Sequence, residues 1–149
     1  MKFARRSILG YGLGSASAVL LGPTSRSRAA AASYKATMDS KSEVPPNQSP
    51  ATGTATVTYD DSTKTVTWQG TFTGLSGPAT AAHIHGPAAA GKNAGVLVPL
   101  GNVPKSPLHG SATLTAEQEQ QLAAGELYVN VHTKNHPSGA IRGQLTKAP

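Results

Sequence analysis

The chain has 149 residues, which suits one compact domain with a short additional segment and leaves no room for a two-domain enzyme. It contains 16 Gly and 11 Pro but only 5% aromatic residues, a composition that favours a turn-rich β domain. The absence of Cys excludes disulfides, Cys-ligated metals and thiol catalysis. Five of the 13 Lys and Arg precede Ser33, whereas all seven Asp and Glu follow it, so the net charge of +6 is concentrated at the N-terminus. We therefore expect no nucleic-acid partner.

Residues 1–32 have the features of an export signal. They combine a basic start, a weakly apolar stretch and a run of small residues of the kind found at cleavage sites. Arg5 and Arg6 before a stretch of low hydrophobicity resemble the twin-arginine signal of bacterial proteins that are exported already folded. The stretch holds too much Gly and Ser for a spanning helix, so we expect no stable membrane anchor after signal cleavage. The mature protein is predicted to be one periplasmic or extracellular domain, residues 33–149.

The mature domain is predicted to consist of short strands and one short helix. Alternation of polar and apolar residues indicates strands, and it directs Val66 and Trp68 toward the core. Thr115 followed by Gln118 is typical of a helix start, so residues 116–124 are predicted to be helical. The predicted strands cover residues 34–39, 54–59, 65–73, 79–85, 96–100 and 127–132, with a last strand near 141–145. This pattern predicts an all-β fold, an antiparallel Greek-key-like sandwich or barrel of seven to eight short strands with one short helix.

Histidines are the residues with the most informative chemistry. His83 and His85 lie two positions apart, so both side chains share one face of a strand. If Ile84 and the valines beside His132 point into the core, all three imidazoles lie on the opposite faces of their strands. They converge if the two strands are neighbours. Imidazole suits copper or zinc, so His83, His85 and His132 are the candidate metal ligands, with Tyr128, Asn130 and Arg142 as the residues expected around them.

Other interpretations of these residues stay open. The histidines are also explained as polar strand residues that bond to the backbone or to Asn130. Arg142 points away from the core and is expected either in a sheet-surface salt bridge or near a ligand anion. His109 and His136 are placed in Pro- or Gly-containing loops and are weaker candidates. No phosphate-binding loop and no nucleophile elbow occurs, so no catalytic residue is assigned.

Four segments resemble the CHRD domain, a family named from chordin and found in exported bacterial proteins. They are residues 43–46 (EVPP), 81–88 (AAHIHGPA), 128–133 (YVNVHT) and 137–145 (PSGAIRGQL), and the resemblance spans residues 34–146. It implies a β-rich extracytoplasmic module, and in chordin such domains bind proteins. Ala140 stands where the family commonly has an acidic residue. The strand with His83 and His85 is also locally similar to the copper strand of Cu/Zn superoxide dismutase.

These observations favour an exported binding module of CHRD type without catalytic activity of its own, whose partner is an unidentified protein or small ligand. The alternative is a periplasmic copper- or zinc-binding protein that uses the three histidines. A third hypothesis is a redox enzyme at that metal. No cofactor other than copper or zinc is implied by the residues.

Overall fold

The computed structural model describes residues 31–149, so the predicted export signal lies outside the described residues except for its last two positions. The described part contains nine strands and one helix. The helix is α1 (Ala116–Ala123). The strands are β1 (Ala32–Asp39), β2 (Thr52–Asp60), β3 (Thr65–Thr73), β4 (Ala79–His85), β5 (Val96–Asn102), β6 (Leu108–Thr113), β7 (Tyr128–Thr133), β8 (Ile141–Gln144) and β9 (Thr146–Lys147).

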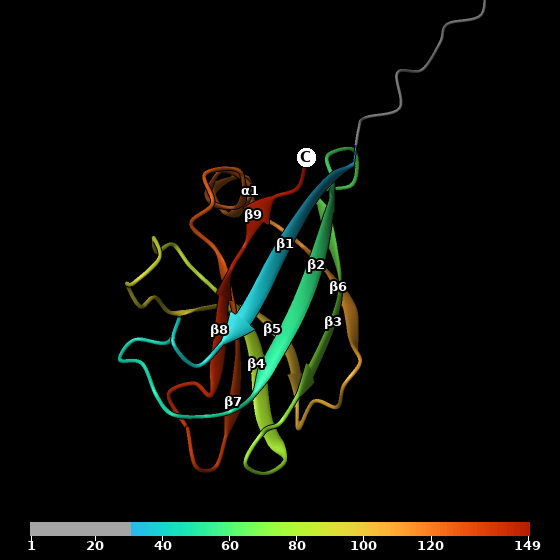
Figure 1. Cartoon of the computed structure of the whole chain (residues 1–149). Helices are drawn as coiled ribbons and strands as arrows, with labels where there is room; N and C mark the ends of the chain where they lie inside the picture. Colours follow the sequence, from blue (N-terminus) through green and yellow to red (C-terminus); the bar gives the residue numbers. More distant parts are fainter. Residues whose placement is uncertain (1–30) are drawn as a thin grey trace, which may run out of the picture.

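Eight strands form one antiparallel sheet that curls into a nearly closed barrel (Figure 1). Their order is β5-β4-β7-β8-β1-β2-β3-β6, and the short β9 pairs with β1. The two edge strands, β5 and β6, approach each other and so close most of the gap. The chain crosses the sheet between β3 and β4 and again, through α1, between β6 and β7. The predicted all-β fold with one short helix is confirmed, and it is barrel-like.

The barrel interior is filled by the apolar residues of every second strand position. On β3, Val66 and Trp68 are buried, while Thr67 between them and Gln69 after them are exposed, as the alternation predicted. The same rule buries Ile84 on β4 at 2% exposure. Because each inward position removes apolar surface from water, this alternation supplies the main driving force for closing the sheet. The residues buried with no accessible surface include Met38, Val129, Val131, Ile141 and Leu145.

Two strands were missed by the sequence analysis. Residues 108–113 form β6, which pairs with β3 through Trp68 opposite Gly110, so His109 lies on a strand and not in a loop. The segment Leu-His-Gly-Ser-Ala-Thr has one β-branched residue and a central Gly, and therefore has weak strand propensity. Packing of Gly110 against the Trp68 ring compensates for this weakness. The other missed strand, β9, has only two residues.

The helix forms as its sequence predicts. Thr115 caps it by accepting a hydrogen bond from the backbone N–H of Gln118, and the Gln118 side chain accepts one from the backbone N–H of Thr115. Leu122 is buried and fixes α1 against the barrel end. No helix among residues 31–149 has the length and apolar character needed to cross a membrane.

Two long loops cover the outer face of β4, β7 and β8. They are residues 40–51, after β1, and residues 86–95, after β4, and both project from the same side of the barrel (Figure 1). Asn93 in the second loop donates a 2.8 Å hydrogen bond to the backbone oxygen of Val44 in the first. Asn47 reaches the backbone oxygen of Gly139 at 3.1 Å. Polar residues on this outer face are therefore buried although they point away from the core.

Candidate metal centre

The three candidate histidines lie on the outer face of two neighbouring strands. β4 and β7 are paired, with Ala81 opposite His132 and His83 opposite Asn130. His132 is therefore the diagonal neighbour of His83, a position within reach of a large ring. Ile84 and Val131 point into the core, so the histidines on either side of them point outward. We call His83, His85 and His132 the histidine cluster.

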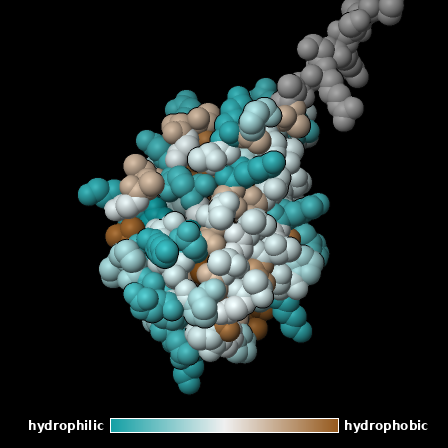
Figure 2. All heavy atoms as spheres, viewed as in Figure 1, coloured by the Kyte–Doolittle hydropathy of each residue, from teal (hydrophilic) through white to brown (hydrophobic). Residues whose placement is uncertain are grey.

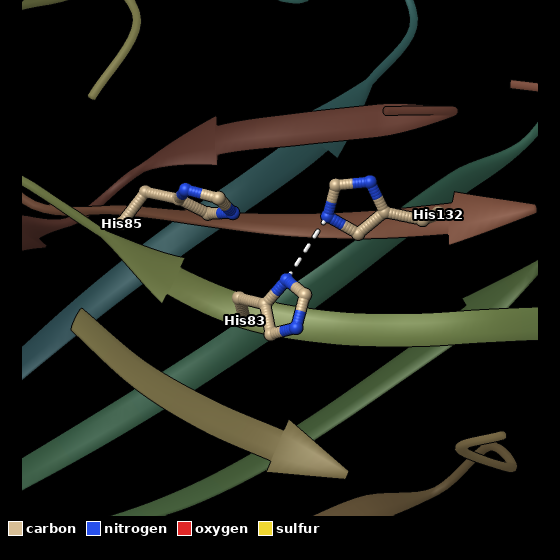
Figure 3. Close-up of side chains that lie close together, drawn as sticks. All are labelled: His83, His85 and His132. Atoms are coloured by element: carbon tan, nitrogen blue, oxygen red, sulfur yellow. Dashed lines mark hydrogen bonds between the residues drawn. The ribbon is translucent and has the colours of Figure 1, made fainter. Parts of the chain in front are cut away.

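The rings of the histidine cluster face one another (Figure 3). Their centroids are separated by 5.0 Å for His83 and His132, 5.3 Å for His83 and His85, and 5.8 Å for His85 and His132. One ring nitrogen from each residue lies within 4.8 Å of the other two. The structure therefore brings together all three residues that the sequence analysis singled out as ligands.

Backbone carbonyls fix the tautomers of two of these rings. Nδ1 of His85 lies 3.1 Å from the carbonyl oxygen of Ala94, and Nδ1 of His132 lies 3.0 Å from that of Pro137. A carbonyl oxygen only accepts, so both Nδ1 atoms must donate a proton. The Nε2 atoms of His85 and His132 then carry lone pairs. A carbonyl bond to the second ring nitrogen is the usual way to orient a metal-binding imidazole.

The two lone pairs have different surroundings. Nε2 of His132 lies 3.1 Å from Nδ1 of His83, which therefore donates the proton of that hydrogen bond. Nε2 of His85 is buried and has no hydrogen-bond partner, while the residue as a whole is 9% exposed. Leaving a buried acceptor unpaired costs about 1–3 kcal/mol, so this nitrogen needs an explanation.

Burial keeps the histidine cluster neutral. The pKa of each of the three imidazoles is lowered, in every case chiefly because burial penalises the charged form. Neighbouring positive charge adds to the effect: a charged His85 would repel His83 and His132, and Arg142 repels a charged His85. Because metals bind the neutral imidazole, the lowered pKa values extend the pH range in which the rings are ready to act as ligands.

Tyr128 packs on the His85 ring, and Arg142 packs on the Tyr128 ring. The Tyr128 ring is stacked on the His85 ring, with centroids 5.0 Å apart and planes 7° from parallel. The guanidinium carbon of Arg142 lies 3.5 Å from the centroid of the Tyr128 ring, which is a cation–π contact. The Tyr128 hydroxyl also accepts a 3.1 Å hydrogen bond from the backbone N–H of Ala94, whose carbonyl holds His85. These contacts fix the orientation of the His85 ring.

Asn130 does not contact the histidine cluster through a hydrogen bond. Its side chain donates a 2.7 Å bond to Oε1 of Glu43 instead. The alternative interpretation of the histidines is therefore confirmed in one part: His85 and His132 bond to the backbone oxygens of Ala94 and Pro137. Its other part, a bond to Asn130, is wrong, because Asn130 bonds to Glu43.

The expectation that Arg142 forms a sheet-surface salt bridge is wrong. Arg142 is 1% exposed, and within residues 31–149 the ion pairs closer than 4.0 Å join Lys64 to Asp61 and to Glu119. The loops after β1 and β4 cover the outer face of the sheet at Arg142. A residue that points away from the core is therefore still shielded from solvent here. Tyr128 and the neutral oxygen of Asn93 are its main partners.

Glu43 is a polar residue of this region that sequence reasoning did not assign. It is buried, and burial raises its pKa to about 7 although Arg142 and the bond from Asn130 favour the charged form. Gly139 packs so closely on the pair that a Cβ there would lie 2.5 Å from atoms of both Glu43 and Asn130. The available signal was a carboxylate placed before two prolines, in the first of the four segments that resemble CHRD domains.

Comparison with known proteins gives one result beyond the structure. The model of the CHRD domain family matches residues 34–145, which is most of the chain and includes the histidine cluster, Glu43 and Arg142. No curated protein and no solved structure shows a significant match. The four segments that suggested this family all fall within the matched range. The chain therefore belongs to the CHRD domain family.

Proposed function

We propose that this protein is an exported CHRD-domain module that binds one transition-metal ion, copper in preference to zinc, through Nδ1 of His83, Nε2 of His85 and Nε2 of His132. The observation that carries the proposal is the buried, unpartnered Nε2 of His85 beside the other two ring nitrogens. A metal ion would give this lone pair the partner that it lacks. Three imidazoles are a donor set that copper and zinc both accept, and divalent copper binds such nitrogen sites more tightly.

The distances require only small movements. A metal with bonds of about 2.0–2.1 Å to tetrahedrally arranged nitrogens holds them about 3.3–3.4 Å apart. His83 and His132 already have their nitrogens at 3.1 Å, and the largest separation in the cluster is within 4.8 Å. Rotation of the half-buried His83 ring supplies the remaining adjustment. Metal binding at Nδ1 would require His83 to change tautomer, so that its single ring proton moves from Nδ1 to Nε2.

Export from the cytoplasm is compatible with a metal site made of three imidazoles. The N-terminal pattern of residues 1–32 supports transport across a membrane, and a folded export route allows the metal to be loaded before transport. The donor set contains no thiol, so it needs no reducing compartment. We propose a periplasmic or extracellular location on this basis.

The proposed activity is binding and not catalysis. The cluster offers three neutral imidazoles, and the carboxylate on the same side, Glu43, is already bonded to Asn130. Protein partners receive no support from the face shown in Figure 2, where hydrophobic colour is confined to small separate spots. The exposed large apolar residues in the described part are Val96 and Val103.

Metal titration of the full chain tests the proposal. We expect one equivalent of copper to bind the protein, with nitrogen couplings in the electron paramagnetic resonance spectrum of the copper(II) form. His132→Ala is expected to weaken copper binding by about a hundredfold or more, because it removes one of three ligands. His109→Ala, at an exposed position on β6, is the matched control and should leave the affinity unchanged. Equal copper affinity in the wild type and in folded His132→Ala would overturn the proposed site.

A further inference from the structure

A cleft of about 360 Å³ opens between the two loops that cover the outer face. The first loop contributes residues 41–44 and Pro46, the second contributes Ala90 and Gly91, and β8 supplies Arg142 and Gln144. This volume lies at the small end of the range for ligand-binding sites. The cleft does not include any residue of the histidine cluster.

Arg142 lines this cleft with a positive charge that has no directly bonded carboxylate among the described residues. Its guanidinium bonds only neutral oxygens: Oδ1 of Asn93 at 3.2 Å, Oε1 of Gln144 at 3.4 Å and the backbone oxygen of Ala89 at 3.5 Å. Within residues 31–149 no carboxylate lies within 4.0 Å of it. A buried cation is costly unless it is paired, and guanidinium groups pair best with carboxylates.

The other charged residues of the cleft do not neutralise the positive charge of Arg142. Lys41 adds a second cation to the lining. Glu43 is the carboxylate that lines the cleft, but burial raises its pKa to about 7, so it carries only part of its charge at neutral pH. The protonated form of Glu43 can also donate a hydrogen bond. The lining therefore combines two cations with a group that can accept or donate.

We propose that this cleft binds a small carboxylate ligand of the hydroxy-acid or amino-acid class. The ligand carboxylate lies toward Arg142 and Lys41, and its hydroxyl or ammonium group bonds to Glu43. This arrangement gives the buried guanidinium a directly bonded carboxylate, which it lacks among residues 31–149. A simple carboxylate such as acetate satisfies only the cations and binds less tightly.

A titration of metal-free full-length protein tests this site independently of the proposed metal site. L-lactate, glycine, acetate and inorganic phosphate are added in turn, in the presence of a chelator, and amide resonances are followed by nuclear magnetic resonance. Lactate or glycine is expected to shift the amide resonances of residues 41–44 and 90–91 with saturation in the millimolar range, while acetate binds more weakly. No saturable shift with either compound, or tighter binding of phosphate than of both, would overturn the proposal.

Two cleft variants avoid disturbing the buried Arg142. Lys41→Ala removes an exposed cation and is expected to weaken lactate binding about threefold to tenfold, as loss of a partly screened charge contact does. Ala90→Asp adds a negative charge at the exposed rim and is expected to weaken binding further. Lys134→Ala removes an exposed lysine outside the cleft and is the matched control. Equal lactate affinity in Lys41→Ala, Ala90→Asp and the control would overturn the assignment of the ligand to this cleft.

Discussion

Replacing Glu43 by Gln should change how the stability of this domain depends on pH. The pKa of Glu43 is raised from 4.5 to about 7, mainly because burial penalises the charged carboxylate. Between these two values the folded protein holds a proton that the unfolded chain has released. Stability is therefore lost as the pH rises from about 4.5 through about 7, and the loss is complete above the folded pKa.

The size of the effect follows from the same shift. A shift from 4.5 to about 7 corresponds to an upper limit of about 3–4 kcal/mol, at about 1.4 kcal/mol for each pKa unit. The cleft beside Glu43 is open to solvent, and Arg142 and Lys41 line it with positive charge, so we expect about 1–2 kcal/mol. Gln keeps an oxygen that can accept the bond from Asn130 but has no charge to bury.

Urea denaturation between pH 5 and pH 8 measures this difference. Glu43→Gln should be stabilised relative to the wild type by about 1–2 kcal/mol more at pH 8 than at pH 5. The histidines titrate in both proteins, so their contribution cancels in the comparison. Glu126→Gln, at an exposed position, is the control and should show no such trend. A pH-independent difference between Glu43→Gln and the wild type would refute the reasoning.

Two further predictions follow from the site and the core. The copper affinity of the histidine cluster should be nearly constant from pH 8 to 6.5 and fall below that range, because the pKa values of all three imidazoles are lowered from 6.5 and protons compete only at lower pH. Competition with a chromogenic chelator measures this affinity. An affinity that already falls tenfold between pH 8 and 7 contradicts the prediction. Gly110→Ala should destabilise the barrel by about 1–3 kcal/mol in thermal denaturation, since the added Cβ would lie 2.4 Å from the Trp68 ring. Ser111→Ala, exposed on the same strand, serves as its control, and equal stability of the two variants would count against that packing argument.

Local sequence patterns determined all elements of the fold except β6 and β9, and which face of its strand each side chain takes. The bounds of β3 and β4 agree with the alternation of their residues, and the capping pair at Thr115 and Gln118 determined where the helix begins. The same period of two placed Ile84 in the core and His83 outside it. These features depend on neighbours along the chain, so a single sequence contains them.

The tertiary structure alone decided what surrounds the outward-facing residues. The bond from His83 to His132 spans 49 positions and that from Asn130 to Glu43 spans 87, so both depend on the strand order and on how the loops fold back. An alternating strand shows that Arg142 points away from the core, but not that loops cover it. Burial under those loops raises the pKa of Glu43 and lowers those of the histidines, because desolvation depends on distant segments of the chain.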